Sequence, residues 1–230
     1  MKKMKFTVLA VATAILMSGC ASMSNTGKGA AIGGGGGAAL GAAVGALFGK
    51  DVKSAAIGAA IGGIVGATTG TIIGAKMDRQ KAELEAIQGA QVEDTTDKHG
   101  LPAIKVTFDG GILFATGQST ISPAAQARLS QFSNSLIANP ETDVAIYGHT
   151  DNTGSAATNE RLSQERANAV SSFIASNGVA RTRMTTTGMS FRDPVASNDT
   201  AAGRALNRRV EIYITANSTM IQQAEQQQAH

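Results

Sequence analysis

Two side chains of opposite charge, Asp151 and Arg166, have the spacing of groups that share one binding cleft. Asp151 lies in a Gly-, Asn- and Thr-rich segment between a strand-like run and a helix-like run, and Arg166 falls about two turns into that helix. Side chains on a helix point toward its N-terminus, so Arg166 would reach back toward the loop that carries Asp151. A carboxylate can pair with an ammonium group, and a guanidinium can give two parallel hydrogen bonds to a carboxylate. The pair therefore suits a zwitterionic ligand.

The same residues allow less specific interpretations. An Asp151–Arg166 salt bridge could merely fix the loop, because such pairs are common in proteins. His149 and Asp151 share a face of an extended segment, as metal ligands would, but the sequence offers no evident third ligand. We therefore predict no metal and no cofactor. No nucleophile, base and orienting group can be assembled from the sequence either, so we do not expect an enzyme.

Strand-like and helix-like segments alternate over residues 101–215. Ser122 and Pro123 mark the start of a helix, because serine is a preferred N-cap and proline is favoured at the first helical position. The alternation predicts an α+β fold, a two-layer α/β sandwich with a βαβαβ core. The expected strands are Ile104–Phe108, Gly111–Phe114, Val144–Tyr147, Met184–Thr187 and Val210–Thr215, and the expected helices run from Ser122 to Asn139 and from Thr158 to Asn177.

Several short motifs follow one another within this segment: Tyr147–Gly154, Asn159, Leu162–Gln164, Arg166–Ala167 and Asn207–Ile212. In this order they resemble the OmpA-like C-terminal domain family, and the match covers most of the segment. The resemblance implies non-covalent binding of the diaminopimelate residue in the stem peptides of peptidoglycan.

The resemblance also implies roles for single residues. Asp151 would take the ammonium group of the diaminopimelate side chain, and Arg166 would take its carboxylate. Asn159 would donate a hydrogen bond to a stem-peptide carbonyl, although it could instead cap a helix. Phe114 and Ala115 would belong to the first ligand loop, although Phe114 is as well suited to the core.

Three further positions qualify the resemblance. Ala115 stands where many members of the family have aspartate, and Ser190 stands where a second glycine is common after Gly188. Arg208 and Arg209 are expected to pair with acidic neighbours.

The charge of the chain argues against nucleic acid as a partner. Lys2, Lys3 and Lys5 account for the net charge of +3. The 20 basic side chains less these three leave 17, which balance the 17 acidic ones. Nucleic-acid binding needs a clustered positive face, and a neutral remainder gives it no support.

The N-terminus has the composition of a signal peptide. Residues 1–19 combine a lysine-rich start, a short apolar core and small residues, and the only cysteine follows directly. Leu16–Cys20 resembles the lipobox of bacterial lipoproteins, which implies lipidation of Cys20. Ala21 and Ser22 follow rather than aspartate, which by resemblance implies sorting to the outer membrane, with the protein lipid-anchored on its periplasmic face. The alternative is a plain signal peptide with an incidental cysteine.

Glycine recurs at every fourth position from Gly29 to Gly49 and again from Gly58 to Gly74. Residues four apart lie on one face of a helix, so each ladder makes a smooth groove against which a second helix can pack closely. We therefore predict a glycine-zipper helical hairpin over 29–88. A flexible Gly/Ala-rich spacer is the alternative.

The remaining segments complete the expected organisation. Residues 20–28 form the lipidated N-terminus, 89–100 the linker to the C-terminal domain, and 216–230 a disordered, glutamine-rich tail. The whole arrangement resembles the YiaD-type envelope lipoproteins. It predicts a tether between the outer membrane and peptidoglycan. A second hypothesis is a homo-oligomer or envelope-biogenesis factor that assembles in the membrane through the ladders and is anchored to the wall.

Overall fold

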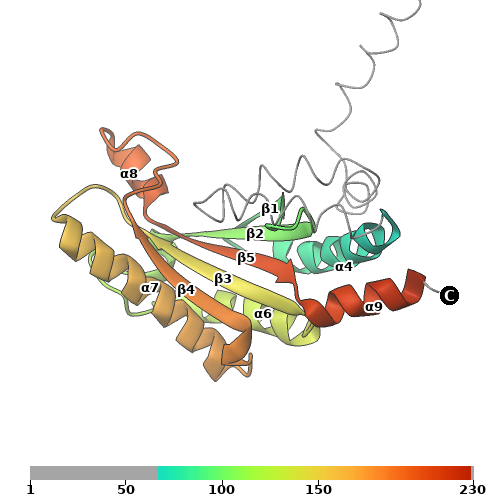
Figure 1. Ribbon diagram of the computed structural model, residues 1–230. Helices are drawn as coiled ribbons and strands as arrows, with labels where there is room; N and C mark the ends of the chain where they lie inside the picture. Colours follow the sequence, from blue (N-terminus) through green and yellow to red (C-terminus); the bar gives the residue numbers. More distant parts are fainter. Residues whose placement is uncertain (1–66, 229–230) are drawn as a thin grey trace, which may run out of the picture.

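The computed structural model describes residues 67–228, which form a five-stranded sheet with helices packed against it (Figure 1). The strands are β1 (Ala90–Thr96), β2 (Pro102–Asp109), β3 (Thr142–His149), β4 (Met184–Ser190) and β5 (Arg209–Ala216). They lie in the order β1-β2-β5-β3-β4. All neighbouring pairs are antiparallel except β3 and β4, which run parallel.

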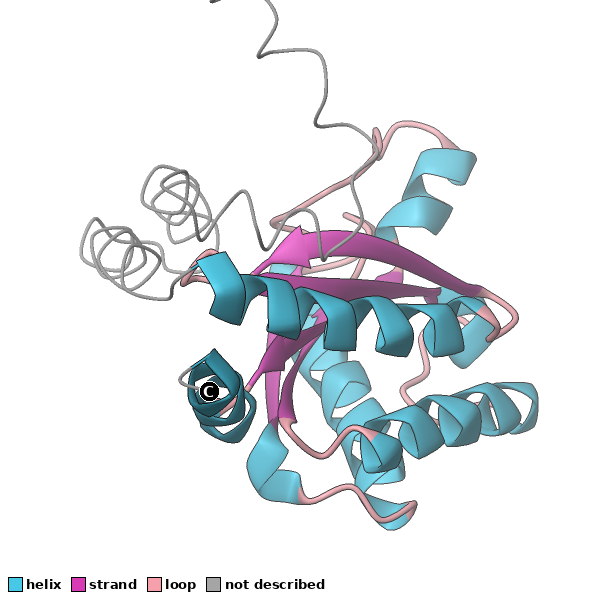
Figure 2. Cartoon of the chain, turned by 90° about the vertical axis from the view of Figure 1, so that its right-hand side faces the viewer, coloured by secondary structure: helices cyan, strands magenta, loops and turns pink. Residues whose placement is uncertain are grey.

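The helices are α4 (Ala67–Glu85), α5 (Gly110–Leu113), α6 (Pro123–Ala138), α7 (Ala156–Ser176), α8 (Ala201–Asn207) and α9 (Ser218–Gln228), with a 3-10 turn at Arg181–Arg183. All of them except α8 form a second layer on one face of the sheet, whereas α8 lies on the other side, as Figure 1 and Figure 2 show. The predicted α+β sandwich is therefore confirmed. Its βαβαβ core consists of β2, α6, β3, α7 and β4, and β5 inserts between β2 and β3.

The core follows from the two-residue period of the strands. Val106 of β2 faces its antiparallel partner Ile212 of β5, and both are fully buried against the helices. Alternate residues along a strand point to opposite faces, so the apolar positions of neighbouring strands meet on one side. Phe108 completes this row and meets the ring of Phe132 from α6 edge-on at 5.9 Å between ring centroids.

Serine side chains define where the two long helices begin. The Ser122 hydroxyl accepts from the Ala125 backbone N–H at 3.2 Å, with Pro123 in the first turn, so this expected start is confirmed. Ser155 does the same for Thr158 at 3.2 Å, which starts α7 two residues before the predicted position. In both cases the hydroxyl satisfies a backbone donor that the helix itself leaves unpaired.

The prediction of a strand at Gly111–Phe114 is wrong. The Asp109 carboxylate accepts from the Gly111 backbone N–H at 2.6 Å and caps the short helix α5, which turns the chain away from the sheet. Only an isolated bridge between Phe114 and Ile121 remains extended. Local side-chain capping thus outweighs the apolar pattern in this segment.

Two segments expected to lack regular structure are ordered. Most of the predicted linker is β1, which pairs with β2 along its full length and is tied to α4 by a Lys81–Asp94 ion pair at 3.0 Å. The predicted disordered tail ends β5 and then forms α9, whose Met220 and Ala224 are buried. The sequence analysis also missed the short helix α8.

The signal peptide, Cys20 and most of the two glycine ladders lie outside the described residues. Gly70 and Gly74 of the second ladder fall within α4, whose core residues Ile73, Met77 and Leu84 recur at helical spacing. Within residues 67–228, no helix combines the length and apolar character needed to cross a membrane.

Close packing of α7 on the sheet depends on two glycines. A Cβ atom at Gly148 of β3 would collide with the Ser163 carbonyl oxygen, and one at Gly188 of β4 would come within 2.7 Å of the Gln164 backbone nitrogen. Both contacts are with the middle of α7, so the helix can lie at this distance only because these positions have no side chain.

We expect Gly148→Ala to lower the free energy of unfolding by about 3 kcal/mol, because the methyl group meets rigid backbone and forces α7 away from β3. Urea unfolding at 25 °C, followed by circular dichroism, measures the change.

Gly154→Ala is the matched control. Gly154 has a positive φ of 89° but open space around it, so only backbone strain of about 1 kcal/mol is expected. Equal losses in the two variants would contradict the close-packing argument.

Candidate functional site

The loop between β3 and α7 is held in shape by its own polar side chains. Asp151 Oδ1 accepts from the Thr153 backbone N–H at 2.8 Å, and Asn159 Nδ2 donates to the Thr153 carbonyl at 2.9 Å. At the start of the loop, the Thr150 backbone N–H donates to the Ser190 carbonyl at 2.9 Å. The loop is therefore anchored to α7 and β4 before any ligand is bound.

Asp151 forms its strongest contact with Arg208, which the sequence analysis did not place in the site. Arg208 Nη1 donates to Asp151 Oδ2 at 2.6 Å. Burial alone would raise the pKa of Asp151, but the hydrogen bonds from Arg208 and Thr153 outweigh it, so the pKa lies below its ordinary value. Asp151 is therefore a carboxylate at neutral pH.

Arg166 approaches from α7 and is almost fully buried, with 3% of its surface exposed. Its Nε donates to the Gln118 carbonyl at 3.0 Å, and its guanidinium carbon lies 5.1 Å from the centroid of the Phe114 ring. Burial lowers the pKa of Arg166, the charge of Arg208 lowers it further, and the charge of Asp151 raises it. The Asp151 carboxylate and the Arg166 guanidinium are thus close enough to interact electrostatically.

The terminal nitrogens of Arg166 are uncommitted. In the described part of the chain, neither nitrogen donates a hydrogen bond to an acceptor. Neither of them is among the fully buried polar atoms that lack a partner. They consequently reach solvent while the rest of the guanidinium is held by Gln118 and Phe114. This leaves two parallel donors available to a planar anion.

The structure brings some of the sequence-predicted residues together and separates the roles of others. Asp151 and Arg166 lie near each other without a direct hydrogen bond, so the simple Asp151–Arg166 salt bridge does not form. Phe114 is buried, and the Arg166 guanidinium lies over the face of its ring. Asn159 uses its amide nitrogen to hold the loop, and Ala115 is exposed beside Phe114.

Ser190 and Arg208 stand out in the sequence, but neither is predicted from it to take part in the site. Ser190 stands at a positive φ of 54°, and its backbone N–H donates to the Ser163 hydroxyl at 3.0 Å, which joins β4 to α7 next to the loop. The departure from glycine at Ser190 was a visible signal of this special backbone position. For Arg208, the expectation of an acidic partner is confirmed, but nothing local identifies Asp151 as that partner.

Comparisons with known proteins cover both halves of the chain. Residues 113–208 match the OmpA family, and residues 1–78 match the YMGG-like Gly-zipper family. The probable lipoprotein YiaD of Escherichia coli strain K12 is 37% identical over 220 residues, which cover 94% of this chain and 99% of that protein. The chain belongs to the OmpA family.

Other relatives of this OmpA-family chain match its C-terminal half. The peptidoglycan-binding protein ArfA of Mycobacterium tuberculosis is 40% identical over 49% of this chain and 34% of that protein. The structure of the cell wall anchor of the T6SS from Pseudomonas aeruginosa is 33% identical, with a TM-score of 0.51, over 61% of this chain and 97% of that chain. A putative MotB-like protein from Desulfovibrio vulgaris, 24% identical with a TM-score of 0.55 over 65% of this chain and 96% of that chain, shares the fold.

A second polar cluster of this OmpA-family domain lies on the sheet face opposite α6 and α7, and its central residues are buried. Its centre is Glu211, which accepts from Arg209 Nε at 2.7 Å, pairs with Lys105 Nζ at 3.3 Å and accepts from the Tyr213 hydroxyl at 2.9 Å. His149 Nε2 lies 3.8 Å from Glu211. Within residues 67–228, no group of three or more His, Cys, Asp or Glu side chains is placed to hold a metal ion.

His149 is buried and neutral. Burial, together with the charge of Arg209, lowers its pKa from 6.5 to about 4 against the opposing effect of Glu211. As the pH falls below 6.5, the unfolded chain binds a proton that the folded chain does not, so acid favours unfolding until the pH approaches 4.

We expect the free energy of unfolding to fall by about 2 kcal/mol between pH 7.5 and pH 5 through His149 alone. Urea unfolding at both pH values, for the natural chain and for His149→Asn, measures it. The variant should lose that part of the pH dependence. An identical decline in both proteins would show that His149 does not titrate in this way.

Proposed function

We propose that the C-terminal domain binds the diaminopimelate residue of peptidoglycan stem peptides without covalent chemistry. The distal end of that residue carries an ammonium group and a carboxylate. Asp151 takes the ammonium group, and the two terminal nitrogens of Arg166 take the carboxylate. The observation that carries the proposal is the buried Arg166 guanidinium, held at one nitrogen, with its other two donors open beside a charged Asp151.

The supporting residues explain why such a site would discriminate between stem peptides. Gln118 and Phe114 fix the plane of the Arg166 guanidinium, so little side-chain freedom remains to be lost on binding. A lysine-type stem has no carboxylate at this point and would cover these donors without giving them an acceptor, which costs about 1–3 kcal/mol. In this proposal Asn159 and Ala115 contribute less directly. Asn159 shapes the loop, and Ala115 is exposed beside Phe114.

The N-terminal half would complete a bridge between two layers of the envelope. A lipid on Cys20 anchors the chain in the outer membrane, because several acyl chains at about 0.8 kcal/mol per buried methylene hold far more firmly than one. The names of the relatives describe a lipoprotein, a peptidoglycan-binding protein and a cell wall anchor, which supports tethering rather than catalysis.

Removing either charge of the site should release the protein from the cell wall. We expect Asp151→Asn and Arg166→Met each to weaken co-sedimentation of the full chain with purified diaminopimelate-type sacculi by at least about tenfold, because each leaves one end of the ligand unpaired.

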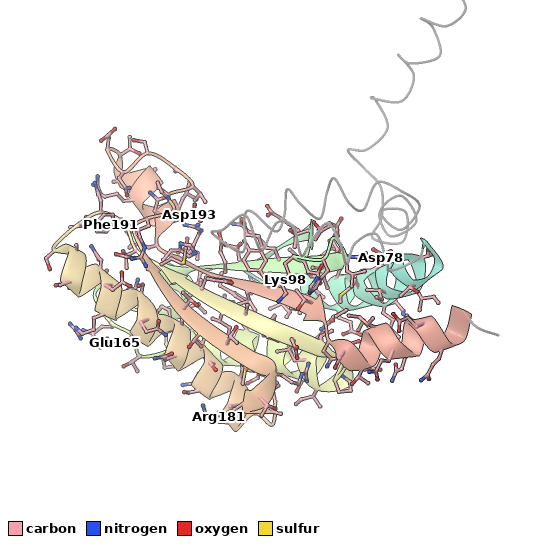
Figure 3. All side chains as sticks on the ribbon, in the orientation of Figure 1. Asp78, Lys98, Glu165, Arg181, Phe191 and Asp193 are labelled. Carbon is pink, nitrogen blue, oxygen red and sulfur yellow. The ribbon has the colours of Figure 1, made fainter. Side chains whose placement is uncertain are left out.

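Arg181→Met is the matched control, since Arg181 lies at the far end of α7 from the loops around Phe191 and Asp193 (Figure 3). It removes the same charge as Arg166→Met and should bind sacculi normally. Full binding by an Asp151→Asn, Arg166→Met double variant that unfolds like the natural chain would refute the site.

The anchor has its own test. We expect Cys20→Ser to move the protein from the outer-membrane fraction to the soluble periplasmic fraction or to leave its signal peptide uncleaved, because the cysteine thiol is the point of lipid attachment. Fractionation after sacculi are digested measures membrane attachment separately from wall binding. Undiminished membrane attachment of a processed Cys20→Ser chain would contradict it.

A further inference from the structure

We propose that Arg208 is the residue that makes the site require a ligand whose side chain ends in both an ammonium group and a carboxylate. This inference rests on the proposed binding of diaminopimelate and concerns the selectivity of that same site. Arg208 acts by occupying Asp151 in the free protein and by giving the site an excess positive charge.

The charges of the free site do not balance. Asp151 contributes one negative charge, whereas Arg166 and Arg208 contribute two positive charges. Arg208 neutralises Asp151 directly at 2.6 Å, so Arg166 has no carboxylate hydrogen-bonded to it in the described structure. The free site therefore lacks an anion that could pair with the two terminal nitrogens of Arg166.

Arg208 is presented to the site by a backbone fixed on both sides. Its N–H donates to the Arg204 carbonyl at the end of α8 at 3.1 Å, and its own carbonyl accepts from the Gly110 N–H at 2.7 Å. Its side chain is 39% exposed, so the guanidinium can move in solvent although its backbone is held. Arg208 therefore reaches Asp151 from the junction of α8 and β5, and its side chain can leave Asp151 while its backbone hydrogen bonds stay in place.

Arg208 therefore affects the binding of a side chain that ends in an ammonium group alone differently from the binding of one that ends in a zwitterion. A lone ammonium group must displace Arg208 from Asp151 and adds a positive charge to a site that already has one in excess. A zwitterion brings its own carboxylate, which pairs with Arg166 and offers the displaced Arg208 a new partner. Two unit charges a few ångströms apart at the edge of a protein change affinity by about tenfold or more.

The experiment measures the preference for diaminopimelate over lysine rather than the affinity for either. The full chain, purified in detergent, is titrated calorimetrically with a soluble stem tripeptide that ends in diaminopimelate and with the same tripeptide ending in lysine. We expect Arg208→Gln to reduce the ratio of the two affinities by about tenfold, chiefly by strengthening binding of the lysine peptide.

Two further variants keep the result interpretable. Arg208→Lys retains the charge and should retain most of the preference, whereas Arg181→Gln removes a remote charge and should leave the ratio unchanged. Thermal unfolding of each variant establishes that it is folded.

The outcomes separate this inference from the proposed function. If the natural chain prefers the diaminopimelate peptide and folded Arg208→Gln shows the same preference, the role of Arg208 is refuted and the Asp151–Arg166 site stands. If the natural chain binds neither peptide, or binds both equally, the proposed function fails and the role of Arg208 fails with it.

Discussion

The close approach of α7 to β3 and β4 is the constraint on which the site depends. Gly148 and Gly188 remove the two side chains that would otherwise separate the helix from the sheet. At this distance Ser163 reaches the backbone of Ser190, and the start of α7 reaches the loop after β3. Arg166 is carried into the same region on the next turn of the helix. One packing distance therefore sets the positions of the loop and of the guanidinium together.

Neighbouring arginines at the start of β5 are committed to opposite sides of the sheet. Arg208 pairs with Asp151 on the side of the proposed site, and Arg209 pairs with Glu211 on the sheet face opposite α6 and α7. The change of side follows from the two-residue period of the strand. Burial raises the pKa of Asp151 and of Glu211, but the neighbouring arginine lowers it by more, so both acids are charged. In each cluster the charge of the acid is therefore neutralised by an arginine of the protein itself. The cluster that includes Arg166 contains two guanidinium groups and one carboxylate, so it has one positive charge more than Asp151 neutralises.

Local sequence signals predicted those parts of the fold that local interactions decide. The Ser122 and Pro123 helix start and the strand around Val210 needed only capping and period-two patterning. β1 was missed because Gln91, Glu93 and Asp94 make it polar, and an edge strand gains its pairing from β2 rather than from apolar alternation.

In the candidate site, the proximity of Asp151 and Arg166 could be predicted from the sequence, whereas the ion pair between Asp151 and Arg208 could not. Asp151 and Arg166 are joined by one loop and one helix, so their proximity follows from chain geometry. Asp151 and Arg208 are 57 positions apart, and their contact exists only after β5 has inserted between β2 and β3. The C-terminal helix is a similar case, because the glutamine-rich composition conceals two core residues, Met220 and Ala224, whose partners lie on α4.

The docking of α4 has a mechanical consequence. The helix is 19 residues long, about 28 Å, and joins β1 through residues 86–89 alone. Lys76 of α4 contacts Glu141 in the turn before β3 at 3.4 Å and Gln223 of α9 at 3.0 Å, so the helix is held at both places. A pull applied at residue 67 is therefore transmitted along α4 to these contacts and to β1. In the proposed tether, a force between the two ends would be borne by the core itself, and the loop between β3 and α7 would turn with the axis of α4.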